Sequence, residues 1–184
     1  PRRMEKDGIM TDIYWPLQRN VIRGRSDHNT FGLVRRYASG APKPHQGWDF
    51  EAPLQTPVYA IAAGTVAFVR NRGDYGLQLC IEFELAGRTL FAFYAHLSKV
   101  HVSEGAQVSG NELVAASGES GNAAGMAVAD QHVHFEIRTA KQPRLGLQDR
   151  ADRGEDLALD LLVLGRRLDH EVAFAELVDR DRRL

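Results

Sequence analysis

Two histidines separated by one residue, His132 and His134, are the side chains of this chain best placed to do chemistry together. They lie in the run QHVHFEIR, residues 131–138, where polar and apolar residues alternate as is typical of a β-strand. Side chains two apart in a strand point to the same face, so both imidazoles would share a solvent-exposed face while the apolar residues enter a core. Paired imidazoles of this kind can bind zinc or transfer protons.

A second block with the same chemistry lies far upstream, at His45-Gln46-Gly47-Trp48-Asp49. Nearby prolines and Gly47 argue against a helix, so we expect His45 and Asp49 to flank a turn that leads into a strand. The glycine lets the backbone bend until both side chains reach one point. Zinc accepts a carboxylate oxygen beside imidazole nitrogen. Taken alone, however, the block also fits a loop histidine next to an aspartate that caps a turn.

A third candidate, His96, follows a strand predicted over residues 89–94 and precedes a loop, from which it could lean over a cleft. Its local sequence fits equally well a half-buried histidine bonded to a backbone carbonyl. Glu136 shares the face of His132 and His134, where it would either orient a metal ligand or form a cross-strand ion pair with an arginine. The remaining histidines lack patterned neighbours and are assigned to surface or capping positions: His28, His101 and His170.

The composition is that of an ordinary globular domain and excludes several classes of function. The 184 residues carry a formal net charge of −1, which gives no electrostatic footprint for nucleic acid. No apolar run approaches the roughly 20 residues that a membrane-spanning helix needs. A single cysteine, Cys80, excludes an internal disulfide and is expected to be a small buried hydrophobe.

Short β-rich runs separated by glycines predict a mainly β fold, an antiparallel sandwich with wrapping loops. The expected strands cover residues 58–61, 65–70, 77–85, 89–94, 112–116 and 132–138. We predict a disordered segment over residues 1–13, a main domain over 14–150 that begins with wrapping loops and short strands, and a helical extension over 151–184. That C-terminal extension would pack on the main domain or contact a partner protein.

Taken together, the three histidine blocks resemble those of the lysostaphin-type (LytM-type) zinc metallo-endopeptidases, which cut peptidoglycan peptides. That family has a His-x-Gly-x-Asp block, a Tyr-x-His-Leu block and a His-x-His-Phe-Glu block in this order. The corresponding blocks here are His45–Asp49, Tyr94–Leu97 and His132–Glu136, and the likeness covers about residues 30–138.

The resemblance implies a β-sandwich of the duplicated hybrid-motif type with one zinc ion held by His45, Asp49 and His134. His132 and His96 would form the catalytic pair that handles the attacking water and the developing oxyanion. The implied substrates are the stem or cross-link peptides of peptidoglycan, hydrolysed without a covalent intermediate. Such an enzyme would work in the periplasm or outside the cell, and would derive from a longer precursor or an exported fusion.

Two departures from the family pattern lie near the expected cleft. Residues 126–131 form an apparent insertion before the His-x-His block, with Gln131 in place of a proline, and Gln55 stands where a glycine is usual. The inserted loop should border the cleft and alter substrate preference.

Two other functions are compatible with parts of the sequence. One is a non-catalytic module of the same fold that binds the cell wall or regulates a hydrolase, although such modules typically lose metal ligands that this chain keeps. The other is a biotinyl or lipoyl carrier domain, which the run Gly64-Thr65-Val66 also resembles. A carrier would need a modifiable lysine at a hairpin tip and would leave the histidine blocks unexplained.

Overall fold

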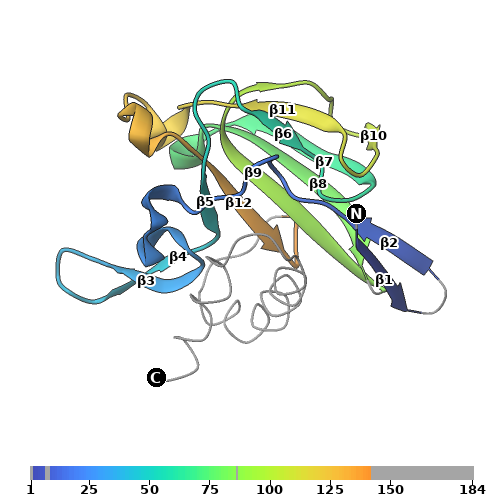
Figure 1. The fold of residues 1–184 in the computed structure, drawn as a ribbon, viewed down its shortest axis with the longest axis horizontal. Helices are drawn as coiled ribbons and strands as arrows, with labels where there is room; N and C mark the ends of the chain where they lie inside the picture. Colours follow the sequence, from blue (N-terminus) through green and yellow to red (C-terminus); the bar gives the residue numbers. More distant parts are fainter. Residues whose placement is uncertain (1, 7–8, 86, 142–184) are drawn as a thin grey trace.

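The computed structural model describes residues 2–141, apart from residues 7–8 and 86. Its body is an eight-stranded sheet (Figure 1). The strands are β5 (Trp48–Glu51), β6 (Pro57–Tyr59), β7 (Gly64–Asn71), β8 (Leu77–Leu85), β9 (Arg88–Val100), β10 (Gln107–Val108), β11 (Leu113–Ser117) and β12 (His132–Arg138). They pair in the order β10-β7-β8-β9-β11-β6, with β12 joining β9 to β5. Every pairing within the described residues is antiparallel, which confirms the mainly β, antiparallel fold.

Two hairpins and several short 3-10 helices surround this sheet. The hairpins pair β1 (Arg2–Lys6) with β2 (Ile9–Ile13) and β3 (Gly32–Arg36) with β4 (Pro42–His45). The 3-10 helices are η1 (Arg23–Arg25), η2 (Asp27–Asn29), η3 (Gly73–Tyr75), η4 (Gly121–Ala123) and η5 (Val128–Asp130). No helix in the described part of the chain has the length and apolarity that a membrane crossing requires.

Two segments of the predicted domain organisation lie at the ends of the chain. The hairpin of β1 and β2 lies within residues 1–13, the segment for which the sequence predicts disorder. The helical extension predicted over residues 151–184, and its possible partner, lie outside the described residues.

The predicted strands are present, and the largest difference concerns β9. Strands β8 and β12 have the predicted bounds, and β6, β7 and β11 differ from prediction by one or two residues at an end. Strand β9, in contrast, continues past Tyr94 to Val100, so His96 does not follow the strand but lies within it. The prediction of a strand end before His96 was wrong, because the pairing partners that extend β9 are distant in the sequence.

His96 interrupts the regular geometry of β9. Its φ of 59° lies in the left-handed region, which is rare for residues other than glycine. The pairing of β9 with β11 shifts register between the partners of Lys99 and Leu97, and its pairing with β8 shifts between the partners of Leu97 and Tyr94. Such an irregularity turns a side chain away from the ordinary alternation, and a strained backbone conformation of this kind is common at functional sites.

The polar face of β12 is also buried, contrary to the solvent-exposed face that the sequence predicted. His132, His134 and Glu136 expose 3%, 4% and 0% of their surface, while Val133 and Phe135 on the other face join the apolar core. The alternation of residue types correctly predicts a strand. Burial of both faces follows from the segments that cover the histidine face, which the alternation of β12 alone does not reveal.

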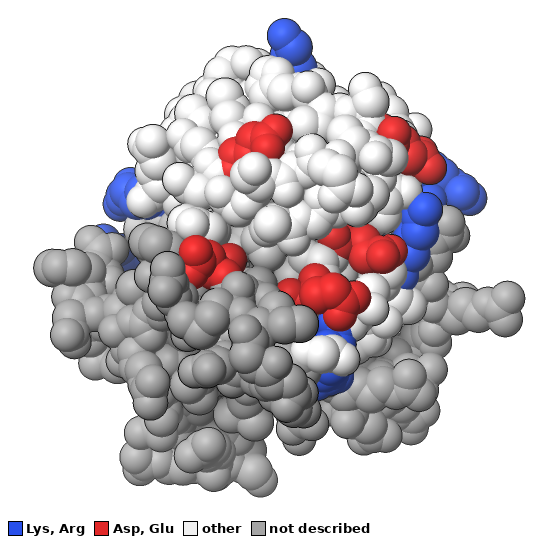
Figure 2. Space-filling view, turned by 90° about the vertical axis from the view of Figure 1, so that its right-hand side faces the viewer, with Lys and Arg blue, Asp and Glu red and all other residues white. Residues whose placement is uncertain are grey.

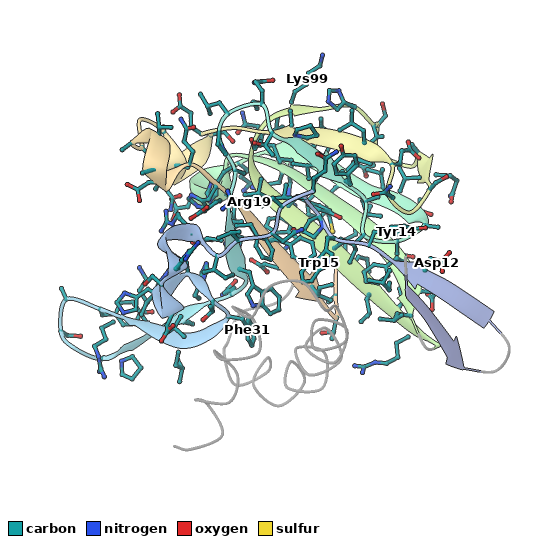
Figure 3. All side chains as sticks on the ribbon, viewed as in Figure 1. Asp12, Tyr14, Trp15, Arg19, Phe31 and Lys99 are labelled. Carbon is teal, nitrogen blue, oxygen red and sulfur yellow. The ribbon has the colours of Figure 1, made fainter. Side chains whose placement is uncertain are left out.

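The segment that precedes the sheet packs against β5 through aromatic rings. The ring of Trp15 meets that of Phe50 edge to face at 6.4 Å, and the ring of Phe31 lies 5.7 Å from that of Trp48. Figure 3 labels Trp15 and Phe31 in the segment that precedes β5. These contacts bury apolar surface and hold the chain around Trp15 and Phe31 against β5, the strand that carries Asp49.

Cys80 lies in the apolar part of β8 with no exposed surface, as the sequence predicted. Burial raises the pKa of its thiol to about 12. Because the thiolate is the reactive form of cysteine, this residue is an inert part of the core.

Gly47 is required where the chain passes from β4 to β5. A Cβ atom at this position would lie 2.2 Å from the carbonyl oxygen of Phe135 and 2.7 Å from Cγ of Glu136. Both neighbours belong to β12, so the backbone of the first histidine block passes directly over the strand that carries the third.

Replacing Gly47 with alanine should therefore lower the free energy of unfolding by roughly 1–3 kcal/mol, the usual cost of overpacking. Urea unfolding of the metal-free protein measures this difference. Lys43→Ala, at an exposed position of β4, is the matched control and should unfold like the parent. Equal stability of the Gly47→Ala protein and the parent would contradict the close approach.

Candidate metal centre and histidine pair

Strand pairing brings the first and third histidine blocks together. In the ladder between β12 and β5, His134 stands opposite Asp49, and in the ladder between β12 and β9 it stands opposite Ala95, next to His96. Directly opposed residues in antiparallel strands have Cβ atoms about 5 Å apart. The register of β5, β12 and β9 thus assembles the site from blocks that are far apart in the sequence.

Three of the predicted residues form one cluster of potential ligand atoms. One atom each from His45, Asp49 and His134 lies within 4.8 Å of the other two. Oδ1 of Asp49 is 2.8 Å from Nδ1 of His134 and 3.1 Å from Nε2 of His45, and these two nitrogens are 3.1 Å apart. All three residues are buried. Two imidazole nitrogens and one carboxylate oxygen are a donor set that zinc accepts, with a further position left for water or substrate.

The outer nitrogen of each clustered histidine is fixed by a second hydrogen bond. Nδ1 of His45 donates to the carbonyl oxygen of Thr30 at 2.8 Å, which leaves Nε2 for the cluster. Nε2 of His134 donates to Oε1 of Glu136 at 2.9 Å, which leaves Nδ1. Metal-binding histidines usually have such a partner, which sets the ring orientation and the tautomer.

Glu136 contacts His134, one of the two alternatives that the sequence left open, while its arginine partner, Arg138, lies on the same strand β12 and not across the sheet. Glu136 accepts from His134, and its other oxygen accepts from Nε of Arg138 at 2.7 Å. The hydroxyl of Tyr75 also donates to Oε1 of Glu136, at 2.9 Å. The guanidinium of Arg138 lies 3.4 Å from the ring centroid of Phe93. The buried carboxylate therefore has several donors, and these hold it against His134.

His132 and His96 lie beside the cluster and face each other. Their ring centroids are 4.9 Å apart at 65°, and Nε2 of His132 is 3.9 Å from Oδ1 of Asp49. Nδ1 of His132 donates to the carbonyl oxygen of Asp130 at 2.8 Å, and Nδ1 of His96 donates to that of Ser120 at 3.0 Å. A neutral imidazole that donates from Nδ1 has an unprotonated Nε2, which can accept a proton.

The pKa values of Asp49 and the four histidines of the site are shifted in different directions. Burial alone would raise the pKa of Asp49, but hydrogen bonds from His134 and His45 outweigh it and hold this pKa well below its usual range. Burial lowers the pKa of His134, yet bonds to Asp49 and Glu136 raise it above its usual value. Burial dominates for the other histidines of the site and lowers the pKa of each: His45, His96 and His132. A cation bound at Nδ1 of His134 would displace a proton from that nitrogen.

His96 gives a pH dependence that can be measured without a metal. Burial lowers its pKa from 6.5 to about 4. Between these values the unfolded chain binds a proton that the folded chain does not, so stability falls as the pH drops through this window. We expect the metal-free parent to lose roughly 1–3 kcal/mol more than His96→Gln between pH 7 and pH 4, because one pKa unit corresponds to about 1.4 kcal/mol. Urea unfolding at several pH values measures the difference, and His101→Gln, at an exposed histidine, should follow the parent. Parallel pH curves for His96→Gln and the parent would contradict the shift.

The apparent insertion at residues 126–131 contacts the site through its backbone. Its η5 turn places the carbonyl oxygen of Asp130 on His132. Gln131 anchors the other side of the loop, because its side-chain oxygen accepts from the backbone N–H of Leu54 at 3.0 Å. The loop thus lies beside His132, and its backbone holds the ring of that residue.

Sequence reasoning missed four residues around the cluster. Tyr75 lies on a short 3-10 helix whose sequence carries no recognisable signal, and its ring lies 5.2 Å from that of His134. The others come from the wrapping segment: Arg23, Asn29 and Arg35. Arg35 donates from Nη2 to Oδ2 of Asp49 at 2.7 Å. Contacts of this kind depend on how a loop folds back, which no local pattern encodes.

A separate hollow of about 520 Å³ has a different character. Acidic side chains line it together with small residues and two aromatic residues, Tyr14 and Phe83; the acidic ones are Asp12, Glu82 and Glu84. Among the described residues, no histidine or cysteine belongs to this lining. Acidic side chains are visible on the face seen in Figure 2. Because none of the clustered ligand atoms belongs to this hollow, it is not part of the candidate metal centre.

Comparison with known proteins adds independent information. Residues 43–145 match the model of Peptidase family M23. The peptidoglycan DD-endopeptidase ShyA of Vibrio cholerae is 35% identical over 100 residues, which is 54% of this chain and 21% of that protein. The DD-carboxypeptidase/endopeptidase Mpg of Neisseria meningitidis is 37% identical over 99 residues, again 54% of this chain and 21% of its own length. The chain therefore spans about a fifth of these relatives.

A solved structure supports the same likeness. The crystal structure of a zinc-containing peptidase from Vibrio cholerae superimposes with a TM-score of 0.55 and 28% sequence identity. The match covers 73% of this chain and 41% of that one.

Proposed function

The chain belongs to peptidase family M23, and on this premise we propose that it is a zinc-dependent endopeptidase that hydrolyses amide bonds in the peptide part of bacterial peptidoglycan. One observation carries the proposal: the ligand atoms of His45, Asp49 and His134 converge within 4.8 Å, with the His96 and His132 rings beside them. A binding module of the same fold would not need this buried set of donors.

In this proposal Nε2 of His45, Oδ1 of Asp49 and Nδ1 of His134 hold one zinc ion. A zinc ion in such a site polarises the substrate carbonyl and activates water as a nucleophile. The hydrogen bonds to Thr30 and Glu136 keep the two imidazoles oriented toward the ion.

The pair His132 and His96 handles the protons. Each ring donates from Nδ1 to a backbone carbonyl and keeps Nε2 available. One of them takes a proton from water at Nε2 and returns it to the leaving amine, as a general base and then a general acid. The other, when protonated at Nε2, donates a hydrogen bond to the oxyanion of the tetrahedral intermediate.

The substrate class rests on the relatives. ShyA is named a peptidoglycan DD-endopeptidase and Mpg a DD-carboxypeptidase/endopeptidase. By extension, this chain would cut stem or cross-link peptides, and it would act in the periplasm or outside the cell, where peptidoglycan lies.

Digestion of purified peptidoglycan tests the proposal. Mass spectrometry of the muropeptides should show new peptide ends with the zinc-loaded protein, none after chelation, and recovery when zinc is added back. Sacculi that bind the protein without new ends would favour the non-catalytic module and overturn the enzyme. The ends themselves would identify the bond that is cut.

A further inference from the structure

The two carboxylate oxygens of Asp49 face different partners. Oδ1 points into the cluster, 2.8 Å from Nδ1 of His134 and 3.1 Å from Nε2 of His45. Oδ2 points the other way, 2.7 Å from Nη2 of Arg35 and 3.8 Å from Nη2 of Arg23. The carboxylate thus has one oxygen for each set of partners, and the arginine contacts oppose a rotation that would exchange the two.

Asn29 ties these two arginines together. Its side-chain oxygen accepts from Nη2 of Arg23 at 2.8 Å and from Nη2 of Arg35 at 3.3 Å, and its amide donates to the carbonyl oxygen of Arg23 at 2.8 Å. Arg35 also donates from Nε to the carbonyl oxygen of His28 at 2.7 Å. Asn29 exposes only 7% of its surface, while the side chains of Arg23 and Arg35 are 17% and 30% exposed, so the group is anchored on a buried residue at the edge of the interior. We call Arg23, Asn29 and Arg35 the arginine clamp.

The charges in this group are not those of a simple compensating ion pair. The carboxylate of Asp49 already has two imidazole partners before either guanidinium is counted. Two further positive charges beside it work against the binding of a cation. The charge of these arginines disfavours a bound metal ion. Their contacts with Asp49 are therefore better explained by a role in orienting the carboxylate that faces the metal.

We propose that the arginine clamp is a positioning device for Asp49: it occupies Oδ2 and so offers Oδ1 alone to the metal. Arg35 is its main positioning residue because it makes the short contact. The clamp comes from residues 23–35, which precede the residues matched by the family, 43–145. The inference rests on the proposed function, because it assumes that His45, Asp49 and His134 hold zinc.

Zinc affinity measured by competition with a chromophoric chelator tests the clamp without any substrate. Loss of a group that orients a metal ligand typically weakens metal binding by about 10–100-fold. We expect an increase of that size in the zinc Kd for Arg35→Gln, and a smaller increase for Arg35→Lys, whose ammonium lacks the planar fork of arginine. Arg36→Gln is the matched control, because the neighbouring guanidinium of Arg36 bonds to the carbonyl oxygen of Gly40 and should leave the Kd unchanged.

The direction in which the zinc Kd changes distinguishes a positioning role of Arg35 from a purely electrostatic one. If Arg35 acted only as a nearby positive charge, its removal would make zinc bind more tightly. The visible spectrum of the cobalt-substituted protein gives a second readout, because it reports the ligand geometry, and it should change in Arg35→Gln but not in Arg36→Gln. A zinc Kd equal to or below that of the parent, or an unchanged cobalt spectrum, overturns the clamp.

Two further comparisons keep the test decisive. Circular dichroism checks that each variant is folded, and if Arg35→Gln does not fold, Arg35→Lys carries the test against Arg36→Lys, with the same expected direction and the same overturning result. If the parent binds no zinc, the proposed function fails. If the parent binds zinc and cuts peptidoglycan while Arg35→Gln keeps the parent Kd, only the clamp fails.

Discussion

Replacing His134 with alanine is expected to abolish stoichiometric zinc binding and to reduce peptidoglycan hydrolysis to background. The change removes one of three donors from a site that needs at least three. It also leaves Glu136 and Asp49 without the imidazole that lies 2.9 Å from one carboxylate and 2.8 Å from the other. Elemental analysis of zinc after dialysis, together with muropeptide digestion, measures both effects.

The control for this variant is His101→Ala, which removes an exposed histidine and should keep zinc and activity. Because His134 is buried, the alanine protein is also checked for folding, and His45→Ala serves as a second variant of the same donor set. Full zinc occupancy in folded His134→Ala and His45→Ala would refute the ligand assignment.

Replacing His132 with alanine should have the opposite profile, with zinc retained and catalysis lost. A positioned general acid or base contributes about 10²–10⁴-fold to the rate, so kcat/KM should fall by that factor. The separation arises because His132 lies beside the clustered donors, with Nε2 3.9 Å from Oδ1 of Asp49. Kinetics on a purified cross-linked muropeptide and zinc analysis of the same sample measure the two quantities together.

His28→Ala, at an exposed histidine of η2, is the control and should retain the parent kcat/KM. A His132→Ala protein that keeps more than a tenth of the parent kcat/KM with full zinc would contradict a role in proton transfer. Loss of zinc from His132→Ala would instead move this residue into the ligand set.

The sequence predicted the strands more accurately than the surroundings of the site. Alternation over β12 located its residues because side chains two apart share a face, and the same pattern placed His132 beside His134. The left-handed His96 could not be predicted, because its conformation depends on two ladders whose partners are distant in the chain. The burial of the histidine face was missed for a similar reason.

The arginine contacts of the candidate site could not be predicted from the local sequence either. Arg23 and Arg35 lie in a stretch rich in arginine, where nothing in the local sequence distinguishes those that reach Asp49 from Arg36, which bonds to a nearby backbone carbonyl instead. Potential metal ligands can be identified from the sequence when histidines and carboxylates recur at short spacing in blocks. Residues that orient those ligands come from loops, and their contacts follow from the folded chain as a whole.

The ladder of β5, β12 and β9 has a consequence for how the protein accommodates a substrate. Asp49, His134 and His96 all lie on strands of one continuous hydrogen-bonded sheet, so they cannot separate unless that sheet opens. Opening paired strands that are packed in the core requires a free energy near that of global unfolding, whereas loops open far more easily. In the proposed enzyme, adjustment to the substrate would therefore fall to the loops around the site, among them residues 126–131 beside His132.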